Sequence, residues 1–245
     1  MSATTALFRN EVRMFTRSPA SLIWALLPML AAVVIAAIPA ARNPNPAFGG
    51  LSVSQAYTPT LTIFAISMTG LVLLPQLLGD YREMGFLRRL RTTPASAADL
   101  LKAFLALMAA LCLLAALVIG LAPLPFGGAV AAAPLRYTVA VLLSTAAFLA
   151  LGTVLCAVIP NPKAASGVGT AVAATQWFAA GMWFPRHLFP EWLSLLTDLL
   201  PGGAATTLMS EAMVPGAATN WLAVAVCGGW SAVGILVALK TFRWE

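Results

Sequence analysis

Long apolar runs, separated by proline pairs and by charged segments, dominate the chain. A helix that crosses a bilayer needs about 20 consecutive, mainly apolar residues. Six runs meet this requirement, and spans are expected at about residues 20–40, 56–79, 103–123, 136–159, 164–184 and 219–239. The pattern predicts an all-α membrane protein with six transmembrane helices, in which residues 1–245 form a single transmembrane domain.

The basic residues give this predicted bundle an orientation. Cytoplasmic segments of membrane proteins carry an excess of Lys and Arg. With the N-terminus inside, eleven of the 14 basic residues fall on the cytoplasmic side, and Arg42, Arg136 and Arg186 fall outside. An odd number of spans would place Lys240 and Arg243 outside, which the same rule disfavours. Six spans with both termini cytoplasmic are therefore expected.

The composition excludes several classes of function. Only 9% of the residues are charged and 60% are hydrophobic, and the charges are too scattered to form a nucleic-acid footprint. No ionisable residue lies in the core of an expected span, so the chain has no proton relay and no intramembrane carboxylate pair. The one histidine, His187, is expected in an outer loop, and the three cysteines are expected to pack as small apolar residues. We expect no catalytic site and no metal site.

The chain also lacks a nucleotide-binding loop of its own. A P-loop requires Gly-Lys followed by Ser or Thr, and no Gly-Lys pair occurs in the sequence. If the protein moves a cargo actively, another polypeptide must supply the energy. A cytoplasmic surface that docks this partner is then expected.

Residues 80–102 form the longest expected inner loop and the most highly charged segment. A short helix is expected over about residues 80–90, and Thr93-Pro94 would end it. The candidate partner-binding residues are Tyr81, Arg82, Glu83, Gly85, Phe86, Arg88 and Arg89. A basic loop that only sets the topology is the simpler alternative.

The first residues, about 3–17, predict an amphipathic helix. Its apolar arc includes Phe8, Val12 and Phe15, whereas Arg9, Arg13 and Arg17 follow one another at intervals of four on another arc. Such a helix is expected to lie in the membrane interface, with its arginines near anionic headgroups. A plain basic anchor is the alternative interpretation.

A third segment, residues 185–201, follows the fifth expected span on the outer side. Its prolines and aromatic residues, with the preceding tryptophan, form a pattern of Trp183, Pro185, Pro190 and Trp192. Apolar and polar positions alternate at helical spacing between Pro190 and Pro201. A short helix at the outer interface is expected there.

Together these motifs resemble those of type-2 ATP-binding-cassette exporter permeases. Arg82-Glu83-Met84-Gly85, followed by Arg88 and Thr93-Pro94, is similar to the loop between the second and third spans of that family. Tyr81 stands where the family often has a charged residue. The resemblance implies that loop 80–102 is a coupling helix resting on a cassette ATPase, and that the N-terminal helix is interfacial.

The resemblance also implies a function. The chain would be a non-enzymatic permease subunit in a bacterial plasma (inner) membrane, working with a second permease copy or a sister permease among membrane lipids. It would carry no cofactor, because ATP and Mg would be bound by the partner ATPase. The cargo expected for an uncharged path is hydrophobic or amphipathic, such as a drug or lipid, and it would move outward. The alternative is a passive channel or facilitator without an ATPase.

Polar residues within the expected spans are the candidates for lining this path. They are Thr62, Ser67, Thr69 and Gln76 on the second span, and Thr170 and Gln176 on the fifth. Hydroxyl and amide groups in membrane helices more commonly bond across packed helices. Both interpretations stay open at the level of the sequence.

Overall fold

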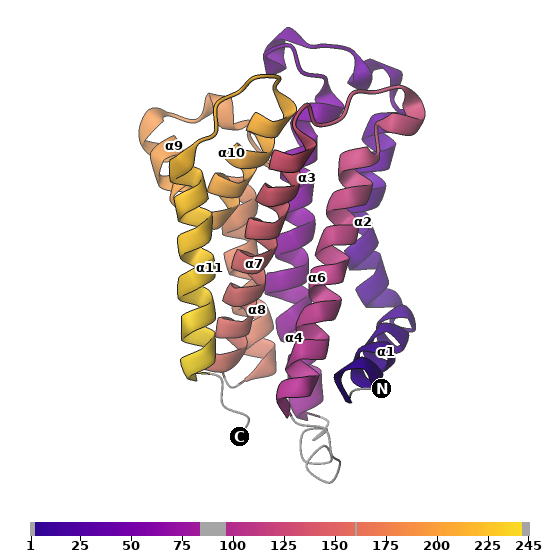
Figure 1. The fold of residues 1–245 in the computed structure, drawn as a ribbon, viewed down its shortest axis with the longest axis vertical. Coiled ribbons are helices and arrows are strands. Elements are labelled where there is room, and N and C mark those ends of the chain that lie inside the picture. The colour runs from indigo at the N-terminus through magenta and orange to yellow at the C-terminus, as the bar shows by residue number, and fades with distance from the viewer. Residues whose placement is uncertain (1–2, 84–96, 160, 242–245) are drawn as a thin grey trace.

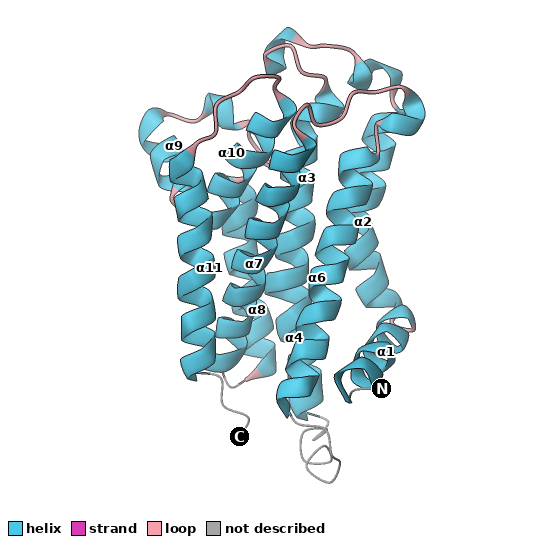
Figure 2. Cartoon of the chain, viewed as in Figure 1, coloured by secondary structure: helices cyan, strands magenta, loops and turns pink. Residues whose placement is uncertain are grey.

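The computed structural model of the chain describes residues 3–83, 97–159 and 161–241. The described part is built from helices joined by short connections, and it contains no β-strand (Figures 1 and 2). This agrees with the all-α class predicted from the sequence.

The long helices follow the apolar runs closely. They are α2 (Pro19–Ala37), α6 (Ala97–Leu121), α7 (Pro134–Val158), α8 (Pro162–Ala179) and α11 (Trp221–Thr241). The second apolar run forms α3 (Val53–Ser67), a π-helical segment η3 (Met68–Leu73) and α4 (Leu74–Glu83). The shorter α1 (Ala3–Thr16) precedes them where the amphipathic helix was expected.

Local capping explains where several of these helices begin. Ser18 accepts a hydrogen bond from the Ser21 N–H, and Pro19 occupies the first turn of α2, so α1 and α2 are separate helices. Ser52 and Gln55 form a reciprocal capping box at the start of α3. The chain therefore encodes these boundaries in its polar and proline residues, independently of the apolar runs.

Five described helical stretches are long and apolar enough to cross a membrane. They are Pro19–Ala37, Val53–Tyr81, Asp99–Phe126, Pro134–Val158 and Trp221–Ala238. The fifth predicted span corresponds to α8, which is a helix but is less apolar than the others because it carries Lys163, Ser166, Thr170, Thr175 and Gln176. Six crossings therefore remain a prediction that depends on α8.

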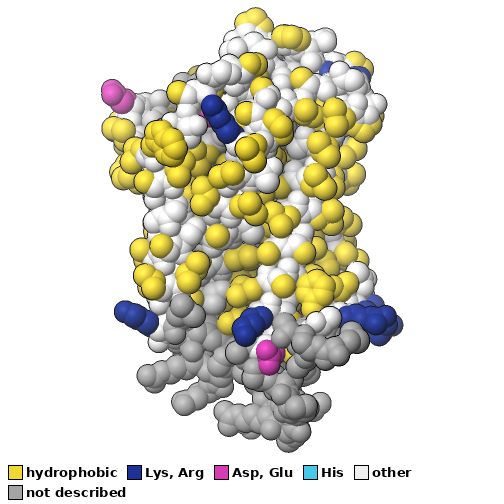
Figure 3. All heavy atoms as spheres, in the orientation of Figure 1, with side chains coloured by type: hydrophobic (Ala, Val, Ile, Leu, Met, Phe, Trp, Pro, Cys, Tyr) yellow, Lys and Arg dark blue, Asp and Glu magenta, His cyan; other side chains and the backbone are white. Residues whose placement is uncertain are grey.

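The long helices lie side by side, and the start of α1 and the end of α11 are at the same end of the bundle (Figure 1). Lys102 and Lys163, at the starts of α6 and α8, and Lys240, in the last turn of α11, lie at this end. Figure 3 shows hydrophobic side chains over the middle of the molecule, with Lys and Arg near its two ends. This distribution matches a protein surrounded by a hydrocarbon layer between two aqueous phases.

The opposite end of the bundle carries the short helices. They are η1 (Pro39–Arg42), η2 (Pro46–Phe48), η4 (Leu124–Phe126), η5 (Arg186–Leu188), α9 (Glu191–Asp198) and α10 (Pro201–Met213). Helix α10 was not predicted from the sequence. It packs against α3, α7, α8 and α11 and is almost wholly buried, but its 13 residues are too few to cross a bilayer.

Three glycines bring α7 and α8 unusually close to the π-helical segment. A Cβ added at Gly152 of α7 would lie 1.9 Å from the carbonyl oxygen of Gly70, and one at Gly169 of α8 would lie 2.0 Å from that of Leu71. A Cβ at Gly70 would lie 2.8 Å from the Phe148 carbonyl oxygen. Small residues allow such backbone contact between membrane helices. The centre of the bundle is therefore held by backbone-to-backbone packing around η3.

The orientation can be tested by labelling single cysteines. Cys112, Cys156 and Cys227 are buried, so they contribute little background labelling. An Ala47→Cys side chain on η2 is expected to react with an impermeant thiol reagent added outside sealed cells. A Lys163→Cys side chain, at the other end of the molecule, is expected to react only after the cells are permeabilised. Labelling of Lys163→Cys in sealed cells would overturn the orientation.

Candidate docking end and transport path

Helix α1 lies against the end of the bundle that is predicted to face the cytoplasm, the inner end. Phe15 is buried, and Phe8 and Val12 are half-buried against the same apolar cluster, whereas Arg9 and Arg13 are exposed. Arg17, just after the helix, is exposed as well. The structure thus shows that one face of α1 packs on the protein. That the arginine face contacts lipid headgroups stays a prediction.

A buried carboxylate lies on the packed face of α1. Glu11 is 3% exposed and accepts a hydrogen bond from the Tyr81 hydroxyl, which is 2.9 and 3.0 Å from the two carboxylate oxygens. Tyr81 belongs to the last turn of α4, and its ring packs edge-on against Phe104 of α6 at 5.2 Å between centroids. Its hydroxyl also lies 3.2 Å from the Met14 sulfur. Tyr81 therefore connects α1, α4 and α6.

Burial raises the pKa of the Glu11 carboxyl above its usual value, and the hydrogen bond from Tyr81 partly offsets this rise. Glu11 is not among the site residues predicted from the sequence, although its position in the helical pattern indicates burial. Glu11 is spaced four residues from Leu7 and from Phe15, so it falls on the apolar arc and not on the arginine arc.

The remaining residues of the predicted docking loop are only partly within the described structure. Arg82 and Glu83 end α4, and their side chains are not described. Gly85, Phe86, Arg88 and Arg89 lie outside the described residues. Tyr81 is 4% exposed and faces the core, so its own side chain offers little surface to a partner.

Four of the candidate path residues are buried and bonded within the chain. Thr62 donates to the Thr58 carbonyl and lies 2.7 Å from the Tyr137 hydroxyl oxygen. Ser67 accepts a hydrogen bond from the Trp177 indole at 2.7 Å. These contacts join α3 to α7 and α8, as expected for polar groups that hold packed helices together.

Thr69 and Gln176 have similar roles. The Thr69 hydroxyl donates to the Ala65 carbonyl, and the Gln176 side-chain oxygen accepts the Gly202 N–H at 2.9 Å, which caps the start of the buried α10. Gln76 of α4 and Thr170 of α8 are different, because both are exposed on two helices that pack against each other. Of the six candidates, only these two are available to a cargo or to another chain.

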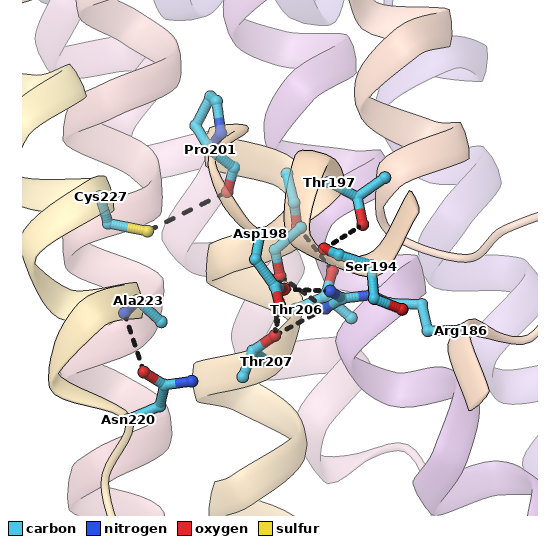
Figure 4. A network of polar contacts seen from close by, with 12 residues as sticks. Arg186, Ser194, Thr197, Asp198, Pro201, Thr206, Thr207, Asn220, Ala223 and Cys227 are labelled. Carbon is cyan, nitrogen blue, oxygen red and sulfur yellow. Dashed lines mark hydrogen bonds and ion pairs between the residues drawn. The ribbon is translucent and has the colours of Figure 1, made fainter. Parts of the chain in front are cut away.

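The outer segment is held by a polar network around Arg186 (Figure 4). Its guanidinium donates to the Gly203 carbonyl at 2.7 Å and to the Thr207 hydroxyl at 2.6 Å, and it forms an ion pair with Asp198. The network ties η5, α9 and α10 together. The network was not predicted from the sequence, because Arg186 and its partners share no recognisable motif.

The four outer residues selected from the sequence lie around this network. Pro185 and Pro190 immediately precede η5 and α9, where their fixed φ angles suit helix starts. Trp183 and Trp192 are exposed, at 53% and 63% of their surface. Exposed tryptophans near the end of a membrane bundle are typical of the interface region.

Within the part of the chain that the structure describes, no group of three or more His, Cys, Asp or Glu side chains could hold a metal ion. The described residues instead show a surface helix at one end of the bundle, an apolar belt, and a polar network at the other end. These features, with several apolar helices of membrane-spanning length, define a multi-pass membrane protein.

Comparison with known families gives the assignment. Residues 2–214 match the family described as ABC-2 type transporter. The chain belongs to this family of membrane domains, which are permease subunits of ATP-binding-cassette transporters. Membership implies a partner ATPase in a membrane setting. A search of curated proteins found no match.

Proposed function

We propose that the chain is the permease subunit of an exporter that moves a hydrophobic or amphipathic cargo, a drug or a lipid, outward across a bacterial inner membrane. A separate cassette ATPase, which binds ATP and Mg, docks on loop 80–102. Two permease chains, identical or related, enclose the path. The proposal rests on the apolar character of the buried interior. It rests also on membership of a family that depends on a partner ATPase.

The inner end has the arrangement that docking requires. The loop 80–102 begins at the end of α4 and leads into α6, and both helix ends lie beside α1. Helices α1, α4 and α6 share one apolar cluster, which includes Phe15, Leu78 and Leu100. A push on this loop would therefore act on a packed unit and tilt the spans attached to it.

The interior favours an uncharged cargo. Among the described residues, Glu11 is the one charged side chain in the buried class, and it lies outside the five candidate spans. A charged cargo in a hydrocarbon layer needs compensating charges along its path. An amphiphile does not, because it can keep its apolar part in an apolar environment.

The exposed side of α8 supports a path between two chains. Apart from Val168, its exposed residues beyond the first turn are small or hydroxyl-bearing: Gly167, Thr170, Ala171 and Thr175. On α2, in contrast, large apolar residues such as Ile23 and Leu30 are exposed. Small residues permit close helix approach in membranes. We infer that α8 and the neighbouring Gln76 of α4 face the second chain and the cargo.

A pull-down tests the proposal most directly. The tagged chain, extracted from its native membrane in mild detergent, is expected to retain a cassette ATPase in near-equal amount. Reconstituted together, the two are expected to move a fluorescent amphiphile only when ATP is present. Flux in liposomes that contain the permease alone would instead support the passive channel or facilitator.

A charge exchange in the docking loop tests where the ATPase binds. The double substitution Glu83→Arg and Arg88→Glu is expected to lower ATPase recovery in the pull-down at least about fivefold, because complementary charges at an interface become repulsive. Membrane insertion should be unchanged, as judged by the amount of folded protein. The substitution of Arg136 by glutamate at the outer end serves as a control for a charge reversal away from the loop. Undiminished recovery of the ATPase with the double variant would remove the loop from the docking surface.

A further inference from the structure

The contact between Glu11 and Tyr81 joins the surface helix to the helix from which the docking loop begins. Tyr81 is two residues from Glu83, the last residue of α4. At 1.5 Å of rise per residue, the side chain lies within about one helical turn of that end. A displacement of the docking loop would therefore reach Tyr81 before it reaches any deeper part of the bundle.

We propose that Glu11 is a positioning residue for energy coupling, which acts through Tyr81 to fix the inner end of α4 against α1. The inference rests on the proposed function, because it concerns how motion of the docking loop is passed to the spans. In this role Glu11 touches neither the ATPase nor the cargo. It sets the position of the element that links them.

The chemistry of the contact supports this role. A carboxylate removed from water is costly unless it is hydrogen-bonded, whereas an apolar side chain at residue 11 would pack α1 on the bundle without that cost. A hydrogen bond adds direction. Because the Tyr81 hydroxyl is nearly equidistant from both Glu11 oxygens, at 2.9 and 3.0 Å, the contact restrains the rotation of α4 as well as its distance from α1.

The apolar contacts around Glu11 attach α1 to the bundle, so the hydrogen bond to Tyr81 is not needed for that attachment. Phe15 is buried in the cluster that also holds Leu100 and Phe104, and Leu7, Phe8 and Val12 pack against the same cluster. This apolar contact keeps α1 on α6 even when the hydrogen bond is absent. Loss of the bond is therefore expected to loosen α4 without detaching α1.

The test compares transport with ATP hydrolysis in the reconstituted complex of permease and ATPase. Tyr81→Phe removes only the hydroxyl. We expect ATPase recovery, thermal midpoint and hydrolysis rate close to those of the parent protein, and about a tenfold fall in cargo moved per ATP hydrolysed. Glu11→Gln, which keeps one acceptor oxygen, is expected to cause a smaller fall. The double variant should be no worse than Tyr81→Phe, because both substitutions act on the same bond and Tyr81→Phe already removes its donor.

Tyr137→Phe is the matched control. It removes the same hydroxyl from a buried bond, that to Thr62 at 2.7 Å, in the middle of the bundle and away from the docking loop. Its ratio of transport to hydrolysis is expected to be unchanged. An unchanged ratio for Tyr81→Phe, in a parent complex that is itself coupled, would overturn the role of Glu11 and leave the proposed function intact. A parent protein that recruits no ATPase would overturn both.

If Tyr81→Phe lowers the amount of folded protein, transport per ATP is compared between Glu11→Gln and the parent protein instead, because Glu11→Gln keeps the volume of the side chain. Equal losses of folded protein and of transport for both variants, with the ratio per ATP preserved, would show a structural contact only. That outcome also contradicts the proposal.

Discussion

Replacement of Gly169 by alanine is expected to destabilise the folded bundle strongly. The new Cβ would lie 2.0 Å from the carbonyl oxygen of Leu71, far inside any real contact, and the obstructing atom is backbone. Helix α8 would have to move away from η3, which would break the packing at the centre of the protein. Overpacking of this kind costs about 3 kcal/mol or more. The measurement is the thermal midpoint and the monodisperse fraction of the purified protein in detergent.

Gly167 provides the matched control two residues earlier on the same helix. A Cβ there meets nothing within 4 Å. Gly167→Ala is expected to be neutral or to stabilise by about 0.5–1 kcal/mol, because alanine loses less backbone entropy than glycine in a helix. If the Gly169 and Gly167 variants melt within two degrees of each other, the close approach of α8 to η3 is not as described.

Replacement of Arg186 by glutamine is expected to loosen the outer cap. The shorter side chain cannot reach the Gly203 carbonyl, Thr207 and Asp198 together, so at least two charge-assisted hydrogen bonds are lost. Bonds of this kind contribute about 1.5–3 kcal/mol each when they are buried. Because the Arg186 and Asp198 side chains are 20% and 31% exposed, solvent screening lowers the total below the sum of two such bonds, and we expect about 2 kcal/mol.

The loosening should be local. Hydrogen exchange is expected to increase in α9 and at the start of α10, while α2 and α6 keep their protection. Asp198→Asn, which keeps the shape of the partner and removes its charge, should show a smaller effect of the same kind. A uniform loss of protection over the whole chain would indicate that Arg186 stabilises the bundle globally and not the cap.

The long helices could be predicted from the sequence because hydrocarbon forces a simple pattern on the chain. Every one of the six apolar runs is a helix in the structure, with ends shifted by a few residues. Capping residues such as Ser52 and Asn161 mark those ends. The number of runs that cross the bilayer does not follow from the pattern alone, since α8 combines small and polar residues.

Other features could not be predicted, and each has a physical reason. Helix α10 begins with Pro201-Gly202-Gly203, a sequence that resembles a turn, and only its burial against α3, α7 and α11 makes it a helix. The π-helical segment depends on the three-dimensional approach of glycines from other helices. The sequence spacing around Gly152 does not show that Gly70 is its neighbour.

The structure describes only part of the candidate site. The arginine face of α1 is exposed as its periodicity indicated. Most polar residues of the second and fifth spans, in contrast, bond inside one chain, which favours helix packing over cargo binding at Thr62, Ser67, Thr69 and Gln176. The pairing of Glu11 with Tyr81 required the structure, because 69 residues separate them.

Both described ends of the chain lie at the end of the bundle where loop 80–102 begins. A soluble domain joined by a linker to the start of α1 or to the end of α11 would therefore meet this loop without crossing the hydrocarbon layer. An ATPase domain fused to either terminus of the permease could thus reach the loop within a single polypeptide. Linker length, and not membrane topology, would decide whether such a fusion works.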